Sequence, residues 1–170
     1  MDDVGAQSLL IPYVSTPDEA KKPLDATRYP PAGIRGVAGT TRASRFGRVA
    51  GYAKRAHEEI CVLVQAETKQ ALDNLEAICA VEGVDGVFIG PADLHASLGY
   101  PGETTNAAVV PLMEEAMRRI RKGGPAPALG GDERLVQHVH AGDEAQLAGA
   151  DAAHDAVEVG MIVEGQPARL

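Results

Sequence analysis

The sequence predicts an α/β protein built on a parallel sheet, and three observations lead to this fold class. Apolar runs of strand length alternate with segments of helical periodicity several times in about 130 residues. Two of these strands end at an acidic residue, Glu67 and Asp93. Hydrophobic residues make up 45% of the 170-residue chain, which is enough for one domain with a substantial core.

Composition excludes several classes of function. The net charge is −8 and the isoelectric point is near 5.1, whereas nucleic-acid and anionic-membrane surfaces need a basic footprint. No apolar run approaches the roughly 18 residues of a membrane-spanning helix, and no basic-then-apolar signal opens the chain. We therefore expect a cytoplasmic protein. Cys61 and Cys79 lack metal-binding spacing and are expected to be reduced.

The first predicted unit is a strand over 8–14 followed by a helix over 17–27. The strand is a continuous apolar run, and Thr16 with Pro17 forms a helix start. A glycine-rich loop over 34–41 follows, and 42–59 is helical in pattern.

The second and third units repeat this design. A strand over 60–67 precedes Thr68, which is expected to cap a helix over 69–81. The next strand ends in the apolar run 87–89, and Gly90 with Pro91 closes it before a helix over 92–98.

The remaining elements are less regular. Asn106 is predicted to cap a helix ending near residue 122, and 125–129 is a poor strand. Beyond residue 130 we expect helices over 132–140 and 144–150 and a strand over 156–163. Three nearby histidines could share a metal ion, but residues two apart on a helix point to different sides, so this interpretation is disfavoured. They are His138, His140 and His154.

The loop 90–93 combines a carboxylate with a candidate anion cradle. Asp93 lies just past the carboxyl end of its strand, the edge at which parallel α/β proteins bind ligands. Backbone N–H groups after Gly90 begin a helix and are expected to point toward a bound anion.

Four motifs cover residues 3–12, 26–37, 64–68 and 84–99. In this order they resemble the HpcH/HpaI aldolase family, and the resemblance extends over residues 2–135 within a single domain expected to span 1–170. The resemblance implies a (β/α)8 barrel of the phosphoenolpyruvate/pyruvate-binding superfamily. It also implies a metal-dependent, class II aldolase that cleaves or forms a carbon–carbon bond in a 4-hydroxy-2-oxo acid, giving pyruvate and an aldehyde. The segment 136–170 diverges from the family pattern.

The resemblance also assigns residues. Glu67 and Asp93 match the family's metal ligands, and two carboxylates suit Mg²⁺ or Mn²⁺, with Co²⁺ as a further candidate. The loop of Gly90, Pro91, Ala92 and Asp93 matches the one that receives the pyruvate carboxylate.

Two further positions are of interest beside the ligands. Gln65 lies on the same strand face as Glu67, so we expect it beside the metal ligand and near the substrate. Asp3 is a weaker catalytic candidate, since it matches an acidic position near the family's active site.

Departures from the family leave two alternatives open. A barrel of this type takes about 250 residues, so we expect the first strands to be absent. The family's general-base histidine and substrate arginine would lie there; His57 and His95 do not match their positions. The chain is thus either an incomplete aldolase, with the family's hexamer as the expected oligomer, or a truncated, inactive fragment that at most binds metal and 2-oxo acid or self-associates.

Overall fold

The computed structural model describes residues 2–129, and within them every strand runs parallel to its neighbours. The sheet has the order β1-β2-β3-β4, so strands adjacent in sequence are adjacent in space. Its strands are β1 (Ser8–Ile11), β2 (Cys61–Ala66), β3 (Gly86–Ile89) and β4 (Ala126–Leu129). This confirms the predicted parallel α/β class.

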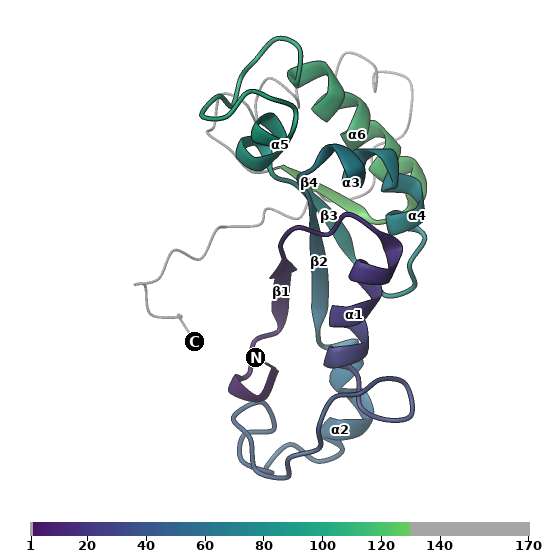
Figure 1. Ribbon diagram of the computed structural model, residues 1–170. Coiled ribbons are helices and arrows are strands. Elements are labelled where there is room, and N and C mark those ends of the chain that lie inside the picture. Colours follow the sequence, from purple (N-terminus) through teal and green to yellow (C-terminus); the bar gives the residue numbers. More distant parts are fainter. Residues whose placement is uncertain (1, 130–170) are drawn as a thin grey trace, which may run out of the picture.

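Helices connect consecutive strands, and the two longest of them pack on one face of the sheet (Figure 1). The helices are α1 (Pro17–Thr27), α2 (Tyr52–Arg55), α3 (Lys69–Asp73), α4 (Leu75–Cys79), α5 (Pro91–Ser97) and α6 (Val110–Gly123), with short 3₁₀ turns η1 (Asp2–Val4) and η2 (Ala56–Glu58). Contacts of α1 with β2 and of α6 with β3 and β4 place them over the sheet, and α4 contacts both helices.

The core lies between this helical layer and one face of the strands. Alternate positions of β2, Val62 and Val64, are buried there with Val87 and Ile89 of β3. The helices supply the other side of the core with Leu24, Leu75, Ile78, Met113, Met117 and Ile120. Gln65, at an intervening position of β2, therefore belongs to the sheet face away from the helices.

Two predicted helix starts are confirmed by their hydrogen bonds. The hydroxyl of Thr16 accepts the N–H of Glu19, and the hydroxyl of Thr68 accepts the N–H of Ala71. Each bond satisfies one of the amide groups that a helix leaves unpaired at its first turn.

The predicted helix over 42–59 is wrong, because only α2 and η2 form there. Upstream, the Ser44 hydroxyl accepts the N–H of Gly47 and donates to the carbonyl of Thr41, a local arrangement that competes with a helix. Arg45 and Phe46 have φ of 49° and 57°, in the left-handed region that interrupts a right-handed helix.

Three boundaries also differ from expectation. The first strand ends at Ile11 rather than residue 14, since Pro12 has no N–H to continue the ladder. The helix expected over 69–81 breaks at Asn74 into α3 and α4, and α6 begins at Val110. Asn106 instead caps the turn before α6, where its side-chain oxygen accepts the N–H of Ala108.

The helices expected over 132–140 and 144–150, the strand over 156–163 and the three histidines lie outside the described residues. The strand over 125–129 is present as β4. Cys61 and Cys79 are both free thiols.

Candidate active site

The carboxyl ends of β1, β2 and β3 meet at one edge of the sheet and bring three side chains together. Glu67 follows the last residue of β2, Asp93 lies in the first turn of α5 just after β3, and Tyr13 follows β1 by two residues. Parallel strands place all of these positions at the same edge, as the sequence predicted for the two acids.

Glu67 is a buried carboxylate with only 3% of its surface exposed. Its Oε1 atom accepts the backbone N–H of Tyr13 at 2.8 Å, and its Oε2 atom accepts the side-chain amide of Gln65 at 3.3 Å. Removal from water raises the pKa of Glu67, the negative charge of Asp93 raises it further, and the bond from the Tyr13 N–H partly opposes both effects. No ion pair is recorded for Glu67 within residues 2–129, so its charge is one that a bound cation would stabilise.

Asp93 is exposed, and it accepts a hydrogen bond from a neighbouring strand end. The phenol of Tyr13 donates to Asp93 Oδ1 at 3.1 Å. This bond, together with the negative charge of Asp93, raises the pKa of Tyr13 above its usual value. Tyr13 therefore contacts Glu67 through its backbone and Asp93 through its side chain.

Gly90 is the residue that lets the two strand ends approach. A Cβ atom at this position would lie 2.3 Å from Oε2 and 2.9 Å from Cβ of Glu67, closer than such atoms approach in proteins. Residue 90 must therefore be glycine, because the buried carboxylate of Glu67 occupies the space that a side chain would need.

The loop after Gly90 has the predicted form of a helix start. Gly90 and Pro91 are buried, whereas Ala92 and Asp93 are exposed. The first helical bond runs from Leu94 N–H to Gly90 O, so the N–H groups of Ala92 and Asp93 precede the helical ladder.

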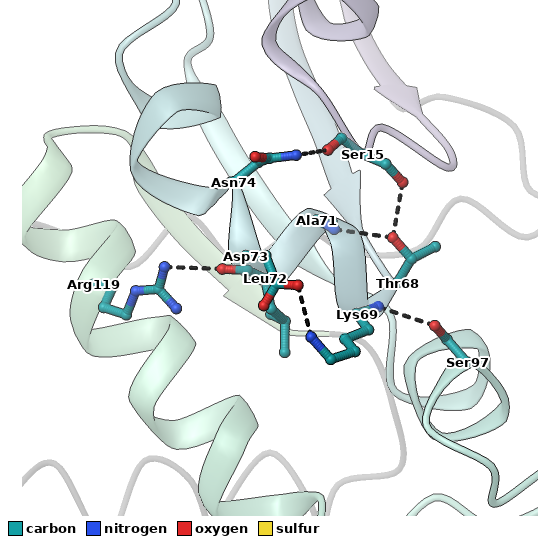
Figure 2. A network of polar contacts seen from close by, with 9 residues as sticks. All are labelled: Ser15, Thr68, Lys69, Ala71, Leu72, Asp73, Asn74, Ser97 and Arg119. Carbon is teal, nitrogen blue, oxygen red and sulfur yellow. Dashed lines mark hydrogen bonds and ion pairs between the residues drawn. The ribbon is translucent and has the colours of Figure 1, made fainter.

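A network of polar contacts fixes the connections on either side of Glu67 (Figure 2). The hydroxyl groups of Ser15 and Thr68 are 2.8 Å apart, and the Asn74 side chain donates to the carbonyl of Ser15 at 2.8 Å. The N–H of Lys69 donates to the hydroxyl of Ser97 at 2.9 Å, which joins α3 to the end of α5. The loops that carry Tyr13, Glu67 and Asp93 are thus tied to one another.

Asp3 is not brought to this edge. It lies in η1, before the amino end of β1, where its carboxylate pairs with the guanidinium of Arg35 at 3.1 Å. Arg35 also lies over the ring of Tyr29, with 4.5 Å between Cζ and the ring centroid. The structure thus places the weaker catalytic candidate at the opposite end of the sheet from Glu67 and Asp93.

His95 is fully buried and both of its ring nitrogens are engaged. Nδ1 is 2.7 Å from the carbonyl of Pro91, and Nε2 accepts the N–H of Asn106 at 3.1 Å. These contacts require the tautomer with hydrogen on Nδ1. His95 therefore ties α5 to the following loop, and it offers no free nitrogen to a substrate.

Tyr13 is the residue that sequence reasoning missed at this site. The apolar run predicts a strand that continues to residue 14, so the sequence alone gives Tyr13 the role of a strand residue. The signal available was its position, since Tyr13 follows a proline at the end of the strand that precedes the one ending at Glu67.

Comparisons with known proteins show that this chain is similar to aldolases. The sequence model of the HpcH/HpaI aldolase/citrate lyase family matches residues 1–158. A hydroxypyruvate/pyruvate aldolase from Sagittula stellata is 54% identical over 136 residues, which are 79% of this chain and 54% of that protein. A 4-hydroxy-2-oxovalerate aldolase from Rhodococcus jostii is 56% identical over 127 residues, 75% of this chain and 49% of that protein.

Solved structures agree with the sequence comparison. An HpcH/HpaI aldolase/citrate lyase family protein from Burkholderia cenocepacia superposes with a TM-score of 0.77 and 36% identity, covering 82% of this chain and 56% of that one. The chain spans about half the length of the curated relatives that it matches. With a family match over most of its length and relatives above 50% identity, the chain belongs to the HpcH/HpaI aldolase/citrate lyase family.

Proposed function

We propose that this chain carries the metal- and 2-oxo-acid-binding part of an aldolase that cleaves or forms a carbon–carbon bond in a 4-hydroxy-2-oxo acid, with pyruvate and an aldehyde as the other side of the reaction. The observation that carries the proposal is the pair Glu67 and Asp93 at the carboxyl edge of the sheet, in a chain of this family. The names of the relatives, which include pyruvate and 4-hydroxy-2-oxovalerate aldolases, support this substrate class.

The residues present fit a hard divalent cation. Glu67 is buried and has a raised pKa, to which the charge of Asp93 contributes, so a bound cation would offset both the desolvation and the repulsion. No group of three or more His, Cys, Asp or Glu ligands occurs in the part of the chain that the structure describes. Two carboxylates with water and substrate oxygens suit Mg²⁺ or Mn²⁺, and Co²⁺ is a further candidate.

The protein groups have separate tasks in this proposal. Glu67 and Asp93 would hold the ion, whose chemistry is Lewis-acid polarisation of the substrate's keto oxygen. The N–H groups of Ala92 and Asp93 are candidates to receive the substrate carboxylate beside buried Gly90 and Pro91. Gln65 orients the ligand carboxylate through its bond to Glu67 Oε2.

We further propose that the four strands are consecutive strands of a (β/α)8 barrel. The sheet order follows the sequence, the helices cover one face, and the acids lie at the carboxyl edge, where barrel enzymes carry their sites. The outer edge of β1 has no strand partner among residues 2–129, and Leu10 there is 40% exposed. We infer that another strand or another copy covers this edge, which is compatible with a homo-oligomer.

Titration calorimetry with Mn²⁺ tests the metal assignment. We expect Glu67→Gln and Asp93→Asn each to weaken Mn²⁺ binding by more than roughly tenfold, because a site with two protein carboxylates has no ligand to spare. Glu82→Gln, an exposed carboxylate in the turn before β3, is the matched control and should bind as the wild-type chain does. Unchanged affinity in both site variants would refute the assignment.

Deuterium exchange into the methyl group of pyruvate, followed by NMR, tests the 2-oxo-acid part of the proposal. Exchange should depend on added Mn²⁺ or Mg²⁺ and should be lost in Glu67→Gln, since polarisation of the keto group acidifies the methyl hydrogens. Metal binding without any exchange would leave the chain a metal-binding protein and remove the support for aldolase chemistry.

A further inference from the structure

Tyr13 is placed so that one residue contacts both proposed metal ligands. Its backbone N–H donates to Glu67 Oε1 at 2.8 Å, and its phenol donates to Asp93 Oδ1 at 3.1 Å. The two acceptors follow different strands, so these bonds join three strand ends across the edge of the sheet.

The backbone at Tyr13 adopts an unfavourable conformation to make the first contact. Its φ of 57° lies in the left-handed region, which is sterically unfavourable for a residue with a Cβ atom. The next residue returns to the sheet, because the N–H of Val14 donates to the carbonyl of Gln65 at 3.1 Å. A kinked residue between a strand end and this bond directs its N–H to the buried carboxylate, and such conformations persist where the surroundings enforce them.

The side chain of Tyr13 does not serve the core. The residue is 60% exposed, whereas the core of this protein is built from buried aliphatic side chains. An exposed aromatic ring is stabilised little by the hydrophobic effect. The orientation of the Tyr13 ring is therefore explained by the hydrogen bond from its hydroxyl to Asp93.

We propose that Tyr13 is a positioning residue for the carboxylate pair, with its backbone N–H fixing Glu67 and its phenol fixing Asp93. This rests on the proposed metal-binding function of that pair. Asp93 is exposed on the first turn of a short helix, so its carboxylate is free to rotate unless a donor holds it. The phenol holds Oδ1, and the carboxylate enters metal binding already oriented rather than losing rotational freedom at that step.

Tyr13→Phe removes the phenol donor and leaves the backbone contact in place. We expect this variant to bind Mn²⁺ roughly tenfold more weakly than the wild-type chain, the lower end of the range for groups that orient metal ligands. Tyr52→Phe makes the same chemical change at a tyrosine of the opposite end of the sheet, near Arg35, and should leave Mn²⁺ affinity unchanged. Wild-type affinity in Tyr13→Phe, or tighter binding, would overturn the proposal, because the phenol would then be neutral or a competitor for the carboxylate.

A double-mutant cycle on the metal-free chain separates this proposal from the proposed function. The shifts in melting temperature of Tyr13→Phe, Asp93→Ala and the double variant should not add, because each single change removes the one hydrogen bond that the two residues share. Additive shifts would overturn the positioning role. If the wild-type chain binds no Mn²⁺ at all, the metal function fails, and the cycle alone decides whether Tyr13 holds Asp93.

Discussion

At the scale of single residues, two groups of the candidate site lower the stability of the fold. Glu67 is a buried acid whose pKa is raised first by desolvation and also by Asp93, so its charged form costs folding free energy. Tyr13, whose N–H contacts Glu67, also has an unfavourable left-handed backbone conformation. Strained and charged groups that persist together are typical of sites that bind something.

This cost predicts that Glu67→Gln stabilises the metal-free chain near neutral pH. A carboxyl with a raised folded-state pKa costs stability above that pKa, and the cost fades as the pH falls to the usual range of glutamate and below. The melting temperature should rise by roughly 2–4 °C for each kcal/mol recovered, and the difference from wild type should shrink in acid. A Glu67→Gln variant that is less stable than wild type at every pH would contradict the argument.

The sequence located the two carboxylates because each follows an apolar strand. It could not locate Tyr13, since the strand that precedes it looked continuous to Val14, and only the folded chain shows that Pro12 ends the pairing. Asp3 matches an acidic position of the family, but it precedes the amino end of β1 and therefore lies at the other end of the sheet. A sequence thus shows which residues lie at the end of a strand. It does not show which loop turns toward the neighbouring strand.

At the scale of elements, the contact between the end of β2 and the start of α5 depends on a missing side chain. Gly90→Ala would place a methyl group 2.3 Å from Glu67 Oε2, so either the carboxylate or the turn must move. We expect a loss of about 1–3 kcal/mol in unfolding free energy, as for overpacked cores, together with weaker Mn²⁺ binding. Gly36→Ala, where no atom lies within 4 Å of the added methyl, is the control and should melt and bind as wild type.

The pair of helices behind the sheet carries a different kind of contact. Arg119 of α6 donates to both carboxylate oxygens of Glu76 on α4 and to the carbonyl of Leu72, and the last of these bonds is drawn in Figure 2. The bond with Arg119 is the main cause that lowers the pKa of Glu76 to about 2. Because Glu76 is largely exposed, we expect only a modest contribution that salt reduces.

Chemical unfolding of wild type and Glu76→Gln across acidic pH tests this pair. A lowered folded-state pKa gives stability that is complete above the usual value of glutamate and is lost as the pH falls through about 2. The two proteins should therefore differ at pH 6 and converge near pH 2 (roughly one pKa unit either way). A constant difference across this range would show that packing, and not charge, distinguishes them.

Helices were predicted correctly where a capping residue precedes a segment whose apolar face is buried. Thr16 and Thr68 cap their helices as expected, because a hydroxyl before an amphipathic stripe acts within one turn. The helix predicted over 42–59 is wrong, because turn-forming Ser44 and Gly47 lie near the start of the segment and Phe46 between them is exposed. The periodicity of a sequence does not show whether another element packs against the apolar face of the predicted helix.

At the scale of the whole molecule, charge and chemistry occupy different ends. The segment 26–57 holds seven Lys or Arg residues and no acid, although the chain as a whole carries −8. Much of it forms turns at the amino ends of the strands, far from the carboxyl edge that holds Glu67 and Asp93 (Figure 1). No helix in the described part of the chain is long and apolar enough to cross a membrane.

The turns around Arg45 expose the backbone to cleavage by a protease. Arg42, Arg45 and Arg48 are exposed and lie outside helices and strands, so within residues 2–129 we expect trypsin to cut there under native conditions. The cut leaves Tyr13 on one piece and both carboxylates on the other, while β1 and α1 stay packed on β2. Mass spectrometry after brief digestion, followed by gel filtration of the uncut and nicked protein, should find two peptides that travel together. Such a two-piece protein would allow the tyrosine and its carboxylate partners to be exchanged independently, by mixing.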